Sequence, residues 1–150
     1  MEFRIVEAER QEQLRQIQGE GALVSSTNVE ILRQACKSRK AAALLNRAFH
    51  PDIGLLRDAK EHGKPFVFPI SMILERNGSE RGKLMARMRF FLKLCVQIGA
   101  PYLLIPGARN EYEEKSEEEL VSIGECLGLS RDQALWSINE TPKLILGDKL

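Results

Sequence analysis

Short apolar runs alternate along this chain with segments of helical periodicity, and this alternation restricts the fold more than any other feature. The runs cover residues 3–6, 22–24, 42–45, 66–70 and 102–105, so they recur at intervals of about 20 to 35 residues. Strand–helix alternation at such intervals is typical of βαβ units and a parallel sheet. The runs lack polar alternation, as expected for parallel strands that are buried on both faces. The sequence therefore predicts an α/β fold with parallel strands, in a single domain over residues 1–150.

Helix-capping signals occupy the stretches between these runs. Helices are predicted over 8–17, from Thr27, over 53–61 and 79–98, from Ser116 to Gly128, from Ser130 and from Thr141. Thr27, Ser116 and Ser130 each precede a Glu or Gln by three residues, which is the spacing of a capping box. Gly63 and Gly99 close two of the helices, because glycine is the usual residue after a helix end.

Two parallel architectures fit this pattern, an open doubly wound sheet and a barrel of the (β/α) type. A closed barrel of eight strands typically takes about 250 residues, whereas this chain has 150. The sequence therefore leaves an incomplete barrel or an open sheet.

Composition excludes several classes of protein. The apolar fraction of 43% supports a core, and the longest apolar runs are far too short to span a membrane. No secretory signal is expected, since no apolar stretch follows a basic start near Met1. Cys36, Cys95 and Cys126 show no metal-binding spacing, so we expect three small buried residues in a protein of the reducing cytoplasm.

Parallel α/β folds bind their ligands at the carboxyl ends of the strands, and here those ends are poor in catalytic groups. The residues at these ends are Glu7, Ser25, Ser26, Asn46, Arg47, Ser71, Gly107, Ala108 and Arg109. They include one carboxylate and no histidine, whereas metal-dependent hydrolysis needs clustered His, Asp or Glu and a nucleophile needs a base beside it. The sequence therefore predicts no catalytic residue and no metal site.

Basic residues form two clusters along the chain, although the net charge is only +1. The first cluster is Arg33, Lys37, Arg39, Lys40 and Arg47, and the second is Arg76, Arg81, Lys83, Arg87, Arg89 and Lys93. In the helix over 79–98, Leu84, Met88 and Phe91 share an apolar arc, while Phe90 and Leu94 fall within the basic arc. A basic face with apolar members suits contact with a phosphate-bearing partner. Trp136 is expected in the core.

The segment 64–146 resembles the ribonuclease P protein component 3 family, the barrel-like protein subunit of archaeal and eukaryotic ribonuclease P. The features that carry the resemblance follow one another in order: Pro65–Ser71, Met72-Ile73-Leu74, Ser79-Glu80-Arg81-Gly82-Lys83, Arg89, Leu92-Lys93-Leu94, Gly99-Ala100-Pro101-Tyr102-Leu103-Leu104-Ile105, Gly107-Ala108-Arg109, Leu120–Leu127, Gly128-Leu129-Ser130, Ala134-Leu135 and Glu140-Thr141-Pro142-Lys143-Leu144-Ile145-Leu146. Residues 3–9 look like the family's second strand, so the fold implied is an incomplete TIM-barrel-like (β/α) fold that lacks the family's first strand. Pro106 departs from the family, which usually has a small hydroxyl residue there.

The resemblance implies a non-catalytic subunit of an RNA enzyme that removes the 5′ leader of precursor tRNA. It implies that the RNA subunit holds magnesium and that this chain holds no cofactor. The implied partners are ribonuclease P RNA, precursor tRNA and a small ferredoxin-like protein subunit, in a dimer of heterodimers. The residues we expect to touch RNA or a partner are Arg76, Arg81, Lys83, Arg87, Arg89, Lys93, Lys37, Arg39, Lys40, Arg47 and Arg109.

Two alternatives stay open from the residues themselves. One is a metal-dependent barrel phosphohydrolase or sugar-phosphate enzyme, which rests on fold analogy. The other is a scaffold protein that binds another chain at an open sheet edge without RNA.

Overall fold

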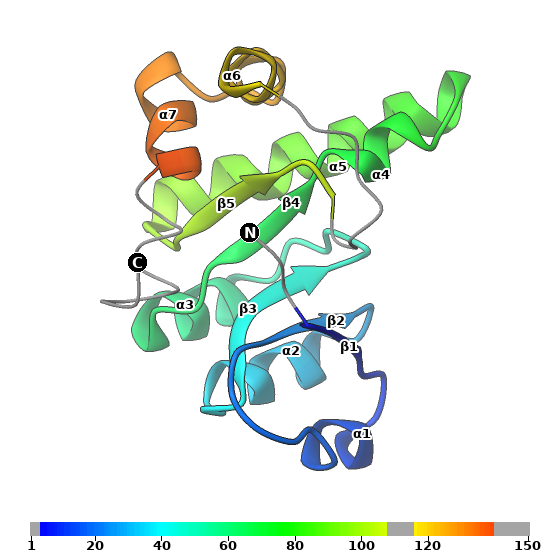
Figure 1. Ribbon diagram of the computed structural model, residues 1–150, viewed down its shortest axis with the longest axis vertical. Coiled ribbons are helices and arrows are strands. Elements are labelled where there is room, and N and C mark those ends of the chain that lie inside the picture. Colours follow the sequence, from blue (N-terminus) through cyan, green and yellow to red (C-terminus); the bar gives the residue numbers. More distant parts are fainter. Residues whose placement is uncertain (1–3, 108–115, 140–150) are drawn as a thin grey trace.

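The computed structural model describes residues 4–107 and 116–139, which form a five-stranded sheet and the helices around it (Figure 1). The strands are β1 (Arg4–Glu7), β2 (Ala22–Ser26), β3 (Ala41–Asn46), β4 (Phe66–Pro69) and β5 (Tyr102–Ile105). The helices are α1 (Gln11–Arg15), α2 (Val29–Cys36), α3 (Ile53–His62), α4 (Ser71–Leu74), α5 (Gly78–Ile98), α6 (Glu117–Cys126) and α7 (Arg131–Asn139). The strands follow one another in chain order and every neighbouring pair is parallel, which confirms the predicted α/β fold.

The connecting helices lie on one face of the sheet, because right-handed crossovers between consecutive parallel strands always return on the same side. Figure 1 shows α3 and α5 behind the strands. Phe66 and Phe68 of β4 contact Phe91 of α5, with ring centroids 4.9 and 6.0 Å apart. A doubly wound sheet carries helices on both faces. The structure is therefore an incomplete (β/α) barrel. Of the two architectures that the sequence left open, the open doubly wound sheet does not fit.

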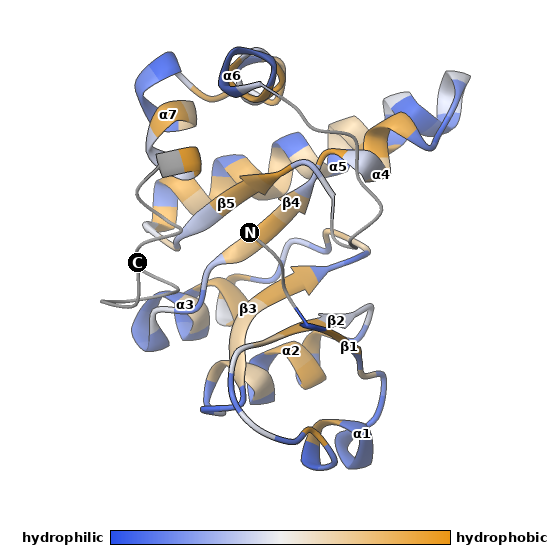
Figure 2. Ribbon diagram, viewed as in Figure 1, coloured by the Kyte–Doolittle hydropathy of each residue, from blue (hydrophilic) through white to orange (hydrophobic). Residues whose placement is uncertain are grey.

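The opposite face of the sheet is also apolar, as in the interior of a barrel. Register pairs Ile5 with Leu23 and Leu23 with Ala43, and it pairs Val67 with Leu103. All of these side chains are buried except Ile5, which is half-buried. Figure 2 shows the strands hydrophobic along most of their length and the helices hydrophilic on their outer sides. This arrangement leaves the carboxyl ends of the strands as the place where polar side chains gather.

Most of the predicted helix ends are confirmed. Gly63 and Gly99 follow α3 and α5 with positive φ angles of 65° and 86°. Ser116 and Ser130 each accept a hydrogen bond from the backbone N–H three residues on, at 3.2 and 3.1 Å. The helix predicted from Thr141 lies outside the described residues.

Three details of the helices differ from prediction. The N-cap of α2 is Asn28, whose side chain accepts from Glu30 N at 3.0 Å, so the capping box at Thr27 is wrong. The Thr27 backbone N–H, from which Glu30 would accept in a capping box, donates to the carboxylate of Glu9 at 3.0 Å, and the Thr27 hydroxyl donates to the same carboxylate at 2.7 Å. The first helix is shorter than predicted, and α4 was not predicted at all.

Two predicted core residues lie at the surface. Cys36 and Cys95 are buried as predicted, but Cys126, the last residue of α6, is exposed. Trp136 is 37% exposed, although its ring lies 5.3 Å from that of Tyr102. It covers the edge strand β5 from α7, and an edge strand has a neighbour on one side only. No helix of the described part is both long and apolar enough to cross a bilayer.

Candidate functional site

The carboxyl ends of the strands surround a pocket of about 390 Å³. Five of the predicted strand-end residues line it: Glu7, Ser25, Arg47, Ser71 and Gly107. They come from β1, from β2, and from the segments after β3, β4 and β5. Glu75 and Arg76, from the end of α4, complete the polar lining. The prediction that these chain-distant residues meet at one edge is therefore confirmed.

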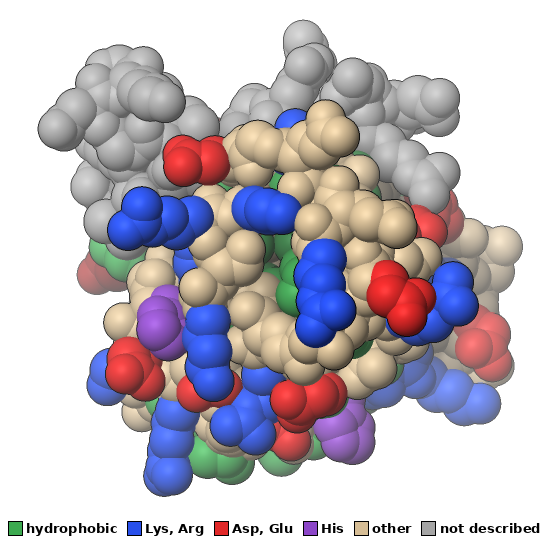
Figure 3. Space-filling model, turned by 90° about the horizontal axis from the view of Figure 1, so that it is seen from below, with side chains coloured by type: hydrophobic (Ala, Val, Ile, Leu, Met, Phe, Trp, Pro, Cys, Tyr) green, Lys and Arg blue, Asp and Glu red, His purple; other side chains and the backbone are tan. Residues whose placement is uncertain are grey.

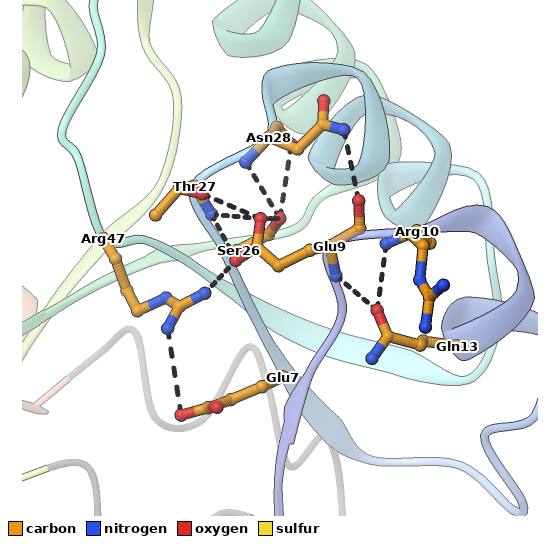
Figure 4. A network of polar contacts seen from close by, with 8 residues as sticks. All are labelled: Glu7, Glu9, Arg10, Gln13, Ser26, Thr27, Asn28 and Arg47. Atoms are coloured by element: carbon orange, nitrogen blue, oxygen red, sulfur yellow. Dashed lines mark hydrogen bonds and ion pairs between the residues drawn. The ribbon is translucent and has the colours of Figure 1, made fainter.

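An ion-pair network occupies the β1–β3 side of this pocket (Figure 4). The Arg47 guanidinium pairs with Glu9 and lies 3.9 Å from a carboxylate oxygen of Glu7. The carboxylate of Glu9 also accepts hydrogen bonds from the Thr27 backbone N–H at 3.0 Å, the Thr27 hydroxyl at 2.7 Å and the Ser26 hydroxyl at 3.2 Å. The network thereby ties β1, the start of α2 and the end of β3 together.

The pKa of Glu9 lies below its usual value of 4.5. Burial raises this pKa, but the hydrogen bonds from Thr27 and Ser26 and the charge of Arg47 outweigh it. The carboxylate is therefore ionised at neutral pH and keeps Arg47 engaged within the chain. Arg47 Nε is buried and has no hydrogen-bond partner among the described residues.

The pocket lining offers little for catalysis. Its described residues combine two carboxylates, two arginines and two serine hydroxyls, and they include no histidine. Within 4–107 and 116–139, no group of three His, Cys, Asp or Glu is placed to hold a metal ion. The carboxylates, guanidinium groups and hydroxyls of this lining can bind polar groups.

Two of the predicted contact arginines cap α4 instead of standing free. Arg76 Nη1 donates to the carbonyl of Met72 at 2.8 Å. Arg81 Nε donates to the carbonyls of Arg76 and Ile73 at 2.8 and 3.1 Å, and its Nη2 donates to Leu74 at 3.3 Å. These carbonyls lie at or just after the end of a one-turn helix, where few backbone N–H groups are available to them. The carbonyl of Ile73 also accepts from the Arg76 backbone N–H at 3.2 Å. Both arginines therefore have a structural role that the sequence did not indicate.

The exposed cations of the second cluster that have no ion-pair partner among the described residues lie in the middle of α5. Leu84, Met88 and Phe91 are buried, which confirms the predicted apolar arc. Arg87, Arg89 and Lys93 are exposed on the other side, and Phe90 among them is 52% exposed. Lys83 lies 3.7 Å from the carboxylate of Glu80, a pair so exposed that it contributes little.

The first basic cluster is divided between the two ends of the sheet. Lys37 and Lys40 lie before β3 and, with Arg15, line a groove of about 430 Å³ beside α1 and α2, whereas Arg47 follows β3. Arg39, between the two lysines, is exposed. Lys40 also donates to the carbonyl of Arg15 at 2.9 Å.

Arg33, also of the first cluster, pairs with Asp58 at 2.8 Å. The side of the molecule nearest α1 shows Lys and Arg side chains among Asp and Glu, so it is not uniformly basic (Figure 3). The predicted contact residue Arg109 lies outside the described residues.

The order of the strands, the helices on one face of the sheet and the strand-end pocket together define an incomplete (β/α) barrel.

Comparison with known proteins shows which proteins this chain is similar to. No family model matches the chain. The chain is similar to ribonuclease P protein component 3 of Methanothermobacter thermautotrophicus, with 28% identity over 130 residues, covering 83% of this chain and 53% of that protein. The protein of the same name from Methanococcoides burtonii is 24% identical over 128 residues, which is 85% of this chain and 50% of that one.

The chain spans about half the length of these curated relatives. The predicted resemblance to the ribonuclease P protein component 3 family is confirmed. Among solved structures, the fold is similar to a chain in the cryo-EM structure of an archaeal ribonuclease P with mature tRNA, with a TM-score of 0.78 and 22% identity. That likeness covers 94% of this chain and 65% of the other. The fold also resembles part of the ochratoxinase of A. niger, with a TM-score of 0.59, 22% identity, and coverage of 93% of this chain and 33% of that one.

Proposed function

We propose that this chain is a protein subunit of ribonuclease P, the RNA-based endoribonuclease that removes the 5′ leader of precursor tRNA. The observation that carries the proposal is the similarity, over more than four-fifths of the chain, to proteins named ribonuclease P protein component 3. The likeness of fold to a chain of the archaeal ribonuclease P structure supports it.

In this proposal the chain binds and supports RNA and leaves the chemistry to the RNA subunit and its magnesium ions. Exposed Arg87, Arg89 and Lys93 on α5 supply cations for phosphate groups. The exposed apolar side chain of Phe90 on the same helix suits a protein contact with a small ferredoxin-like subunit. The complex would be cytoplasmic, with two such heterodimers joined.

The test is reconstitution of precursor-tRNA cleavage at low magnesium from the cognate RNA and the small protein subunit, with and without this chain. We expect a large loss of cleavage rate when the chain is omitted. A triple variant, Arg87→Ala with Arg89→Ala and Lys93→Ala, should restore less activity than the wild type. Arg57→Ala, which removes one exposed charge from α3, is the control for cation loss away from α5 and should restore it fully.

An unchanged rate on omission would contradict the proposal and leave a likeness of fold alone. The metal-dependent phosphohydrolase alternative has its own test, in which the purified chain is incubated with a generic phosphodiester and divalent metal. We expect hydrolysis at background level there, because the pocket lining includes no histidine base.

A further inference from the structure

A second groove of about 410 Å³ lies between α5 and the turn that joins α6 to α7. Arg89, Lys93 and Gln97 form one wall of it and follow each other at intervals of four residues, so they lie in a row along the helix. Gln133 lines the groove from α7, and Gly128 lines it from the turn. The apolar part of the lining is Leu92, Val96, Leu127 and Leu129. This groove is separate from the strand-end pocket, with which it shares no lining residue.

The described lining of the groove carries positive charge. Among the residues that the structure describes, its lining contains two cations and no carboxylate. Neither Arg89 nor Lys93 has an ion-pair partner among the described residues. The nearest acids along α6 and α7, Glu125 and Asp132, do not line the groove. An anion that enters it therefore meets two available donors without displacing an internal partner.

The groove is held in shape by the turn between α6 and α7. Gly128 has a φ angle of +98°, and a Cβ atom there would lie 3.4 Å from Arg89 Nε, so the turn backbone lies directly against this side chain. The Oε1 atom of Gln133 accepts from the Ser130 backbone N–H at 2.9 Å. That bond fixes the Gln133 amide, whose NH₂ group remains a donor. Donors with restricted freedom lose less entropy when a ligand binds.

From these features we propose that the groove binds one unpaired nucleotide of a single-stranded RNA segment. Arg89 and Lys93 would bind the phosphate, the apolar side chains would contact the base, and the amides of Gln97 and Gln133 would bond to its edge. Unpaired RNA can turn a base outward into such a groove, whereas a duplex presents mainly phosphates and 2′-hydroxyls. The choice of RNA over an acidic protein segment rests on the proposed function.

The experiment measures binding of the full chain to a short fluorescein-labelled single-stranded RNA and to an RNA duplex of the same composition, by fluorescence anisotropy at low salt. Val96→Trp fills the groove without changing its charge, and Gln97→Leu removes an amide at nearly constant size. We expect each to raise the Kd for the single strand about five-fold and to leave the Kd for the duplex within two-fold. Arg89→Ala should weaken both ligands, and the charge-matched control Arg57→Ala should change each by less than two-fold.

A second readout maps the contact directly. A single-stranded RNA carrying one 4-thiouridine should cross-link on irradiation to peptides of α5 or of the 127–133 segment, and Gln97→Leu, which is expected to stay folded, should reduce the yield. Equal effects of Gln97→Leu on the single strand and the duplex would overturn the proposal. So would an acidic, leucine-containing peptide that binds more tightly than RNA and loses affinity in Gln97→Leu.

The two proposals fail in different ways. If the chain stimulates precursor-tRNA cleavage but the groove variants bind single-stranded RNA like the wild type, only the groove assignment is wrong. If the groove variants lose single-stranded RNA binding but the chain does not stimulate cleavage, only the ribonuclease P assignment is wrong.

Discussion

At the scale of single residues, Glu9 holds three segments of the chain together, and no sequence pattern near it predicts this role. Its carboxylate joins Ser26 at the end of β2 and Thr27, just before α2, to Arg47, directly after β3. Because the folded-state pKa of Glu9 is lowered, its contribution to stability is fully present above its usual value of 4.5. That contribution is lost as the pH falls through the folded-state pKa.

Glu9→Gln should therefore lower the free energy of unfolding near neutral pH by about 1 kcal/mol, a modest figure because the side chain is 40% exposed. The difference from the wild type should shrink as the pH falls below 4.5. Urea unfolding followed by circular dichroism over a pH series measures it. Glu61→Gln, on an exposed residue of α3, is the control and should change the free energy of unfolding at neutral pH by less than about 0.5 kcal/mol. A constant difference at all pH values would contradict the assigned role of the carboxylate.

The three cysteines give a second prediction at this scale. Burial raises the pKa of Cys36 to about 12 and also raises that of Cys95, so neither thiol forms thiolate at neutral pH. Cys126 is exposed. An aromatic disulfide reagent should modify one thiol per native chain quickly and all three in denaturant. Cys126→Ser should abolish the fast reaction, and fast modification that persists in this variant would contradict the burial of the other two.

The N-cap residue of α2 could not be predicted from the local sequence. Thr27 and Asn28 are both good N-cap residues, and the Glu30 spacing favours Thr27. In the structure Asn28 is the N-cap, and both the N–H and the hydroxyl of Thr27 donate to Glu9, which takes the place that Glu30 has in a capping box. That partner lies 18 residues earlier in the chain. A local pattern contains no information about such a partner.

At the scale of elements, α5 offers a matched pair of glycines. Gly82 lies exposed within the helix, and a Cβ there would meet nothing within 4 Å. Gly99 ends the helix at a φ angle of +86°, which other L-residues rarely adopt. Gly82→Ala should raise the free energy of unfolding by about 0.5 to 1 kcal/mol, since it removes freedom from the unfolded chain. Gly99→Ala should lower it by about 1 kcal/mol.

Thermal and urea unfolding of both variants check this pair, and effects of the same sign would contradict the described helix end. The prediction of that end from sequence succeeded because glycine after a helix has a local cause. The strand-end pocket was also predictable, since parallel strands place their carboxyl ends at one edge whatever their side chains are. The one-turn helix α4 was not, because four residues give no periodicity. The groove beside α5 was missed for a related reason, as its two walls come from distant segments.

At the scale of the whole molecule, clusters along the sequence are not patches on the surface. Lys37 and Lys40 precede β3 while Arg47 follows it, so one sequence cluster is divided between opposite ends of the sheet. In the second cluster, Arg76 and Arg81 bind carbonyls of α4, whereas Arg87 is free on the face of α5. Charge counted along the chain predicts the number of cations, but the fold decides which of them are available to a partner.

This division predicts two kinds of arginine variant. Arg81→Ala removes the guanidinium donor from the carbonyls of Ile73, Leu74 and Arg76 and should lower the free energy of unfolding by about 1 to 3 kcal/mol. Arg87→Ala should change stability by less than about 0.5 kcal/mol, because the exposed side chain has no ion-pair partner among the described residues. It should instead weaken single-stranded RNA binding and reduce the slope of log Kd against log salt by about 0.7.

Arg81→Lys tests whether the hydrogen-bond geometry of the Arg81 guanidinium matters apart from its positive charge. Lysine keeps the positive charge but lacks the planar fork that reaches three carbonyls from one side chain. The lysine variant should therefore be destabilised much like Arg81→Ala while it retains the wild-type salt slope. If Arg81→Ala changed the salt slope as strongly as Arg87→Ala and left unfolding unaltered, Arg81 would be a partner-binding residue. The sequence-based prediction, in which every residue of the second basic cluster contacts a partner, would then be preferred to the division of that cluster into structural and available cations.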